Sequence, residues 1–282
     1  MFPRGTFVDR LISLALDEDL SNGDVTSRCC IPEGHRSRAR IIARQEFFFC
    51  GGPLLNRIAE VAAFEVRWHS LVGEGQRLGD GDVVADAEGD TRELLSLERV
   101  SLNFLQRLSG VATHTAAVTA QSAGMIVLDT RKTTPGWRVL EKYATRIGGA
   151  RNHRCNLGDL ILIKNNHLDA HGGDVDGLFV QIERERPWHM PIECEVRSLD
   201  ELRSILPYNP DFILLDNMSD SLIKESLSLL KSAGFQHCIE VSGGVSPERL
   251  AALAAHGVPA VSMGSLTTQA VSVDISMRLT AS

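Results

Sequence analysis

The chain has 282 residues, of which 43% are hydrophobic and 23% charged, and it carries a formal net charge of −7. This composition is typical of a globular protein, and the acidic balance argues against general nucleic-acid binding, which requires a basic surface. No run approaches 18 uninterrupted apolar residues, so neither a membrane span nor a membrane partner is expected.

The first hundred residues have a mixed pattern. Helical spacing predicts a helix over about 7–18, a second near 53–63 and a long third helix over about 93–121. Between the first two lies a strand-rich segment, and residues 66–90 have Gly or Asp every few positions, which predicts short strands joined by tight turns. The six cysteines have no CxxC spacing, which indicates reduced thiols and a cytoplasmic location.

After residue 121 the rhythm changes, and six short apolar runs recur, most of them separated by helix-length segments. The runs are 125–129, 160–164, 192–196, 212–216, 238–242 and 260–264. Strands that alternate with helices predict a parallel sheet. Six such runs, with no glycine-rich nucleotide fingerprint after the first, favour a closed α/β barrel over an open sheet.

In such barrels the active site lies at the carboxyl ends of the strands. Charged residues end four of the six runs: Asp129 with Arg131 and Lys132, then Lys164, Glu195 and Asp216. Within "IECEV", Glu193 and Glu195 share one face of a strand that should be buried on both faces. Because buried carboxylates need partners, Lys132 and Lys164 are the expected partners.

The other two strand ends are rich in glycine. They consist of Ser242, Gly243 and Gly244, and of Met263, Gly264 and Ser265. Neighbouring glycine ends late in a barrel often bind a phosphate on backbone N–H groups, although a glycine can also serve only to tighten a turn. Two such ends together predict a phosphate site.

The segment from Leu128 to Arg154 holds seven Arg or Lys residues against two acids. Thr134 as N-cap and Pro135 at the first position predict a helix over 135–147. Three of the cations recur every four residues on that helix and are interpreted as a solvated face: Arg138, Lys142 and Arg146. The remaining cations lie in the flanking loops with His153, where they suit a polyanionic ligand: Arg131, Lys132, Arg151 and Arg154.

Several other chemistries lack their motifs. The chain has no GxxxxGK[ST] phosphate loop, no HExxH and no GxSxG elbow. His167 and His171 have the spacing of helical metal ligands, but a surface or loop role is the better interpretation because no third ligand accompanies them.

An ordered set of segments resembles the quinolinate phosphoribosyltransferase family over almost the whole chain. The segments are "EDLSNGDVTS", "ERVSLNFLQRLSGVAT", "LDTRKTTPGWRVLEKYA", "GGARNHR", "LILIKNNH", "IECEV", "ILLDN", "EVSGGV" and "GVPAVSMGSLT". The resemblance implies an N-terminal α/β sandwich over 1–104, completed by the tail 267–282. It also implies an incomplete α/β barrel over 105–266, with the active site at the carboxyl ends of its strands.

The activity implied by this resemblance joins quinolinate to 5-phosphoribosyl-1-pyrophosphate (PRPP) in NAD biosynthesis. The products are nicotinate mononucleotide, pyrophosphate and CO2, and the implied cofactor is Mg²⁺. The pyridine nitrogen is itself the nucleophile, so no catalytic Ser or Cys is required. The resemblance also implies a homodimer, with assembly to a hexamer left open.

The resemblance implies a role for each matched position. The quinolinate carboxylates meet Arg131, His153, Arg154 and, across the dimer interface, Arg99. Lys132 and Lys164 serve the carboxylates and the pyrophosphate. Glu195 and Asp216 face the ribose and Mg²⁺, and the two glycine ends form the phosphate site. Lys132, Lys164, Glu195 and Asp216 are the implied catalytic set.

Three departures from the family pattern affect substrate handling. Ala150 replaces a glycine, Asn165 replaces an acid, and "LTTQ" replaces a segment that usually ends in His or Lys. Three alternatives stay open: a paralogous phosphoribosyltransferase associated with molybdenum uptake, a nicotinate phosphoribosyltransferase and a non-catalytic barrel that binds phosphorylated metabolites. The first tends to have altered "NHR" and "LIKxNH" segments, the second handles one carboxylate, and the third would not need Glu195 and Asp216.

Overall fold

The computed structural model describes residues 2–3 and 5–281, and its chain divides into two compact units. The first unit contains residues 1–117, 132–150 and 265–282, and the second contains 118–131 and 151–264. The predicted domain boundary after residue 104 stays a prediction. Among the described residues, none of the helices is long and apolar enough to cross a membrane.

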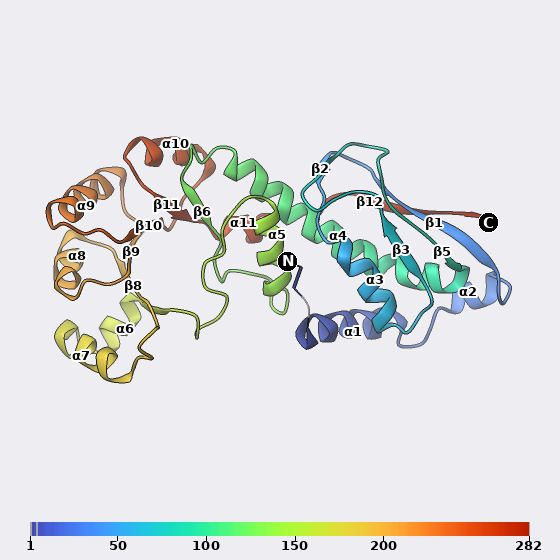
Figure 1. Ribbon diagram of the computed structural model, residues 1–282, viewed down its shortest axis with the longest axis horizontal. Coiled ribbons are helices and arrows are strands. Elements are labelled where there is room, and N and C mark those ends of the chain that lie inside the picture. The colour runs from blue at the N-terminus through green and yellow to red at the C-terminus, as the bar shows by residue number, and fades with distance from the viewer. Residues whose placement is uncertain (1, 4, 282) are drawn as a thin grey trace. The chain divides into compact units, whose positions relative to one another are not determined.

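The first unit is built around a four-stranded antiparallel sheet with the order β12-β1-β5-β3. Its strands are β1 (Arg36–Ala43), β3 (Arg67–Ser70), β5 (Val83–Asp90) and β12 (Ile275–Ala281), and β2 (Phe47–Phe48) pairs separately with β4 (Arg77–Leu78). Exposed and buried residues alternate along β1, as expected for a sheet with one face in the core. The last strand of the chain, β12, pairs with the first, β1, as Figure 1 shows.

The helices of this unit are α1 (Thr6–Leu20), α2 (Val25–Cys30), α3 (Gly52–Val61), α4 (Thr91–Thr119), α5 (Arg138–Ile147) and α11 (Ser265–Thr268). The last two residues of α4 belong to the second unit. The first, third and fourth confirm the predicted helices within about two residues at each end. One apolar core joins α1, α3, α4 and the sheet, and it contains the largest fully buried side chains, among them Phe47, Phe49 and Phe104.

The second unit contains a six-stranded parallel sheet with the order β6-β11-β10-β9-β8-β7. The strands are β6 (Ile126–Leu128), β7 (Ile161–Ile163), β8 (Ile192–Val196), β9 (Phe212–Asp216), β10 (Cys238–Ser242) and β11 (Ala260–Ser262). All six predicted strands are confirmed. The closed barrel is wrong, because no pairing joins β6 to β7 among the described residues. The incomplete barrel implied by the resemblance has this open edge.

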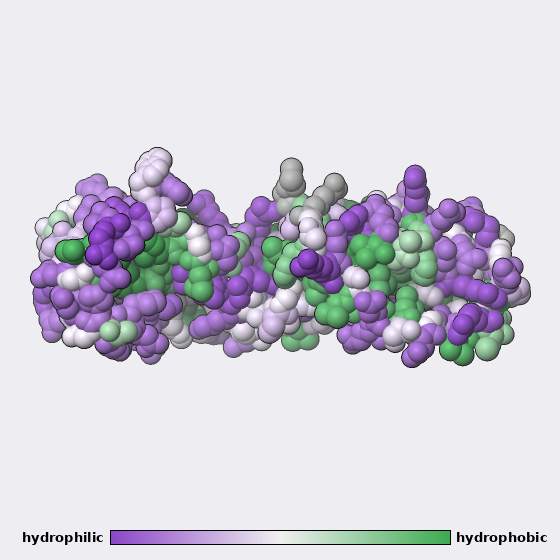
Figure 2. All heavy atoms as spheres, turned by 90° about the horizontal axis from the view of Figure 1, so that it is seen from below, coloured by the Kyte–Doolittle hydropathy of each residue, from purple (hydrophilic) through white to green (hydrophobic). Residues whose placement is uncertain are grey.

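The connecting helices are α6 (Asn165–Ala170), α7 (Val175–Glu185), α8 (Leu199–Ile205), α9 (Asp220–Ser232) and α10 (Pro247–Ala255), with a 3₁₀ turn, η1, at Leu206–Tyr208. In Figure 1, α8, α9 and α10 lie along one side of the strands. Figure 2 shows hydrophilic residues over most of the visible face of each unit, with smaller hydrophobic areas between them.

Candidate active site

Strand register places the acidic residues of the second unit on one face of its sheet. Glu195 pairs with Leu214, which pairs with Glu240 on the next strand. Because side chains alternate along a strand, Glu193 shares this face with Glu195, and Asp216 shares it with Leu214. The opposite face carries apolar residues such as Cys194, Ile213 and Val241, which are almost completely buried.

Glu195 lies at the carboxyl end of β8 and has two neighbours from the junction of β7 and α6, which precedes β8 along the chain. Lys164 Nζ donates to its Oε2, and Asn165 Nδ2 lies 3.3 Å from its Oε1. The side chain of Glu195 is 9% exposed, whereas that of Lys164 is 44% exposed. The predicted pairing of Lys164 with this strand is therefore confirmed, and the ammonium still faces solvent.

A second acidic group lies deeper, and it was not among the predicted site residues. Glu193 and Glu240 are 1% and 5% exposed. His153 Nε2 lies 3.1 Å from Glu193 Oε2 and 3.5 Å from Glu240 Oε2. Both oxygens of Glu193 and Oε1 of Glu240 have no hydrogen-bond partner among the described residues. The contacts of His153 Nε2 with the two carboxylates are thus electrostatic.

The pKa of Glu240 is raised to about 7. Burial is the main cause and the nearby Glu193 charge adds to it, whereas His153, Ser262 and Lys164 act in the opposite direction. A signal for this residue was present in the sequence, since "CIEVS" has a single acid inside an apolar run. Its partner could not be predicted, because Glu193, Glu240 and His153 are far apart along the chain.

Asp129, at the end of β6, organises the loop that carries His153. The carboxylate is completely buried. It accepts a hydrogen bond from the His153 backbone N–H at 2.9 Å and another from Asn152 Nδ2 at 2.6 Å. The Asp129 N–H donates to the Arg151 carbonyl at 3.1 Å. Asp129 is therefore a structural anchor, which its position at a strand end did not reveal.

Two of the predicted cations, Arg131 and Arg154, lie close enough to repel each other. Burial lowers the pKa of Arg154, the Arg131 charge lowers it further, and Glu193 and Asp159 act in the opposite direction. Arg154 Nη1 also donates to the Leu160 carbonyl at 3.1 Å. Two guanidinium groups, each half-buried, form a site that an anion would stabilise.

The two glycine-rich strand ends differ in backbone conformation and in the N–H groups that a phosphate could reach. Gly243 and Gly244 both have positive φ, at 78° and 60°. A Cβ on Gly243 would lie 2.7 Å from the Asn217 backbone nitrogen, so this turn requires glycine. The Met263 side chain is buried and its N–H donates to the Leu128 carbonyl at 3.0 Å, so this residue offers no N–H to a ligand. Ser242 and Gly264 are half-buried at the same strand ends.

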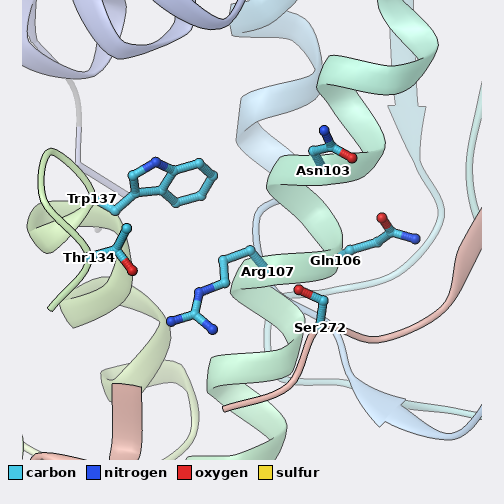
Figure 3. Close-up of a pocket in the computed structure, with 6 residues that line it drawn as sticks. All are labelled: Asn103, Gln106, Arg107, Thr134, Trp137 and Ser272. Atoms are coloured by element: carbon cyan, nitrogen blue, oxygen red, sulfur yellow. The ribbon is translucent and has the colours of Figure 1, made fainter. Parts of the chain in front are cut away.

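Three of the predicted site residues belong to the first unit. Arg99 is exposed on α4, Lys132 is exposed and follows Arg131 along the chain, and Ser265 opens α11. This unit also has a hollow of about 350 Å³ beside α4, shown in Figure 3, with Arg107 and Trp137 in its wall. None of the predicted site residues lines it.

The structure differs from the predicted division of the cations in residues 128–154 into a solvated helix face and a set of loop cations. The helix α5 begins at Arg138, not at Pro135, and Thr134 instead bonds to Glu141 through its backbone N–H and its hydroxyl. Lys142 is 2% exposed, so the predicted solvated face is wrong at this position. The reason is that residues 140–145 of the helix are all buried, which leaves Arg146 as the exposed cation.

Glu195 and Asp216 present the donor set expected for Mg²⁺. Both are carboxylates on the same face of neighbouring strands, and Mg²⁺ is bound through oxygen ligands. His153, Glu193 and Glu240 also have one ligand atom each within 4.8 Å of one another. The Nδ1 of His167 accepts the Lys164 N–H at 2.8 Å, at the start of α6.

Comparisons with known proteins agree along the chain. A family model described as "Quinolinate phosphoribosyl transferase, C-terminal domain" matches residues 111–278, and the N-terminal domain of the same name matches 24–109. A probable nicotinate-nucleotide pyrophosphorylase [carboxylating] from Bacillus subtilis is 37% identical over 268 residues, which cover 94% of this chain and 91% of the relative. The Synechocystis protein of that name is 34% identical over 98% of this chain and 94% of its own.

Solved structures agree with the sequence comparisons. The crystal structure of NadC from Streptococcus pyogenes has a TM-score of 0.90 at 35% identity and covers 98% of each chain. Human nicotinic acid phosphoribosyltransferase, at 12% identity and a TM-score of 0.63 over 98% of this chain and 74% of its own, shares only the fold. With both family domains matched and relatives above 30% identity over nearly its full length, the chain belongs to the quinolinate phosphoribosyltransferase family.

Proposed function

We propose that this chain transfers the phosphoribosyl group of PRPP to quinolinate and releases pyrophosphate and CO2, giving nicotinate mononucleotide for NAD biosynthesis. The observation that carries this function is the half-buried pair Arg131 and Arg154, which repel each other in the absence of an anion. Quinolinate offers two adjacent carboxylates to such a pair. The names of relatives at 34–37% identity state the same reaction.

The residue types suit this chemistry. The pyridine nitrogen bonds to C1 of the ribose while the bond from C1 to the pyrophosphate oxygen breaks, and positive charge develops on the sugar. Glu195 and Asp216 are carboxylates on one face of the sheet, and such groups stabilise a developing positive charge. Lys164, still 44% exposed beside Glu195, is available to the departing pyrophosphate. Arg131 and Arg154 orient the carboxylates before one leaves as CO2.

Mg²⁺ is part of the proposal. When bound, the ion would balance the charge of the pyrophosphate. Glu195 and Asp216 would hold it, directly or through water, because they bring oxygen donors to one face of the sheet. Gly243 and Gly244 would receive the ribose 5-phosphate on their turn.

We further propose a homodimer in which Arg99 reaches the partner's site. Arg99 is exposed on α4, although its helix neighbours Leu97 and Val100 are buried. A mixing experiment tests this arrangement. At a quinolinate concentration far below the KM of either variant, Arg99→Ala and Arg131→Ala are each expected to be strongly impaired, and subunit exchange between them should restore activity in the mixed dimer. No recovery after verified exchange would contradict a shared site.

A cytoplasmic location completes the proposal and is supported by the cysteines, which are all free thiols. The main test is chemical. The purified protein is incubated with quinolinate, PRPP and Mg²⁺, and nicotinate mononucleotide and CO2 are measured together. Equal amounts of the two products are expected. Turnover with nicotinate but not with quinolinate would contradict the proposed substrate.

A further inference from the structure

We propose that Glu193 and Glu240 are positioning residues that act through His153 to fix Arg154 in the anion site. The identity of the anion rests on the proposed function, whereas the arrangement of the four side chains does not. For clarity, these four residues are called the bracket: Glu193, Glu240, His153 and Arg154.

The burial of the two carboxylates requires an explanation. Glu193 and Glu240 lie inside strands, not at their ends, and are 1% and 5% exposed. A buried carboxylate is costly unless it is well paired, and a leucine at either position would avoid that cost. The hydrogen-bonding capacity of both groups is largely unused within the described residues. These acids therefore do not stabilise the fold in the ordinary way.

His153 connects the carboxylates to Arg154. The Arg154 backbone N–H donates to His153 Nδ1 at 2.7 Å. This nitrogen must therefore keep its lone pair, which places the ring proton on Nε2. Nε2 is the atom that lies 3.1 and 3.5 Å from the two carboxylates. Both ring nitrogens of His153 therefore lie against groups of this chain, the backbone N–H of Arg154 on one side and the two carboxylates on the other.

Glu193 also acts on Arg154 directly. The guanidinium is repelled by Arg131 and attracted by Glu193, and its Nη1 is held by the Leu160 carbonyl at 3.1 Å. Without Glu193, repulsion between the two arginines would be less compensated and the imidazole would lose the carboxylate nearest to its Nε2. The bracket therefore keeps two like charges close together before an anion arrives.

The same atoms are within reach of one metal ion, but the neighbouring charges favour the bracket. Glu193 already attracts Arg154, and Glu240 already attracts Lys164. A divalent cation would enter a site with these positive groups beside it, and the lone pair of His153 that remains is used by a backbone N–H.

Steady-state kinetics test the bracket through its effect on binding. Glu193→Leu and Glu240→Leu should each raise the KM for quinolinate about tenfold or more, with kcat and the KM for PRPP within about twofold of wild type. Glu193→Gln and Glu240→Gln keep shape and an acceptor oxygen, so they should recover part of the loss. Glu225→Gln, on the exposed face of α9, is the matched control and should equal wild type.

A second measurement needs no substrate and applies if the leucine variants do not fold. In protein with ¹⁵N-labelled histidine, the two ring nitrogens of His153 are identified by their loss in His153→Asn. The wild type should show the proton on Nε2, and Glu193→Gln should shift the Nε2 signal more than the Nδ1 signal. A proton on Nδ1, or an unchanged spectrum in Glu193→Gln, would overturn the proposal.

Three other results would also overturn it. They are a fall in kcat at constant KM, an equal rise in the KM for both substrates, and Zn²⁺ bound in the purified protein but lost in Glu193→Gln. A wild type that makes no nicotinate mononucleotide would refute the proposed function instead, and the histidine spectrum would then decide the bracket by itself.

Discussion

Each unit of the molecule buries acidic side chains, and these side chains differ in how many hydrogen-bond partners they have. In the first unit, Glu141 is completely buried and accepts from Arg107 Nε at 3.0 Å, Arg107 Nη2 at 2.6 Å, and the N–H and hydroxyl of Thr134. In the second, Glu193 is 1% exposed, and among the described residues neither of its oxygens has a hydrogen-bond partner; His153 Nε2 lies 3.1 Å from its Oε2, and the charge of Arg154 is nearby. A buried acid with all its partners supports the fold, whereas one with few partners marks a site.

Removal of Arg107 should be the most damaging change to the first unit. Arg107→Ala leaves Glu141 buried without its cation and also frees the Ala270 and Thr267 carbonyls. Breaking a buried pair from one side typically costs about 3–5 kcal/mol of the free energy of unfolding. Urea unfolding followed by circular dichroism measures this loss. A loss below about 1 kcal/mol would show that Glu141 is no more structural than Glu193.

Removal of Arg131 should affect binding instead of stability. Arg131→Ala deletes a charge-assisted contact worth about 1.5–3 kcal/mol, which corresponds to a loss of roughly tenfold to a hundredfold in quinolinate affinity by calorimetry. Arg146→Ala is the matched control in the same basic segment, since Arg146 is exposed and lies 5.7 Å from the Tyr143 ring centre. Equal effects on affinity would contradict the separation of these cations.

A methyl group on Gly243 should harm the second unit locally. Gly243 has a φ of 78°, and an added Cβ would lie 2.7 Å from the Asn217 nitrogen. The strain should cost about 1–2 kcal/mol and displace the turn that follows β10. The expected readout for Gly243→Ala is a higher KM for PRPP than for wild type. Gly244→Ala, whose Cβ would meet only Asn217 Oδ1 at 3.6 Å, should be milder.

The smallest expected effect is on the pH dependence of stability. Because the pKa of Glu240 is raised to about 7, the folded state holds its proton more tightly than the unfolded state does. This contribution is fully present below about pH 4.5 and is lost as the pH rises through about 7. Glu240→Gln should therefore flatten the decline in urea midpoint between these values. The charged groups that face Glu240 are Glu193, His153 and Lys164. If the urea midpoint of Glu240→Gln declined with pH as in the wild type, a group other than Glu240 would be responsible for the pH dependence.

The sequence predicts the six strands of the second unit, but it does not predict whether the sheet closes into a barrel. Strands buried on both faces appear as continuous apolar runs, and all six were confirmed in this way. The gap between β6 and β7 depends on pairing between distant segments, so periodicity carries no signal for it. For the same reason the burial of Lys142, predicted to be solvated, could not be read from its spacing along α5.

The site follows the same rule. Lys164, Glu195 and Asp216 were predicted because they end strands, where the position of a barrel site is general. Glu240 was not predicted, and Asp129 was noted only as a charge at a strand end, since the contacts of both residues come from segments far along the chain. The role of His153 toward quinolinate stays a prediction, and the contacts of its two ring nitrogens with Arg154 and Glu193 could not be read from the sequence.

The contrast between the two buried acids can be tested with one pair of variants measured in parallel. Glu141→Gln and Glu193→Gln make the same change in chemistry, and for each the urea midpoint and the KM for quinolinate are determined. We predict that Glu141→Gln lowers the midpoint and leaves the KM of the folded enzyme unchanged. Glu193→Gln should raise the KM and leave the midpoint unchanged or higher. The reverse pattern, or a loss of stability alone in both variants, would contradict the division into a structural and a functional acid.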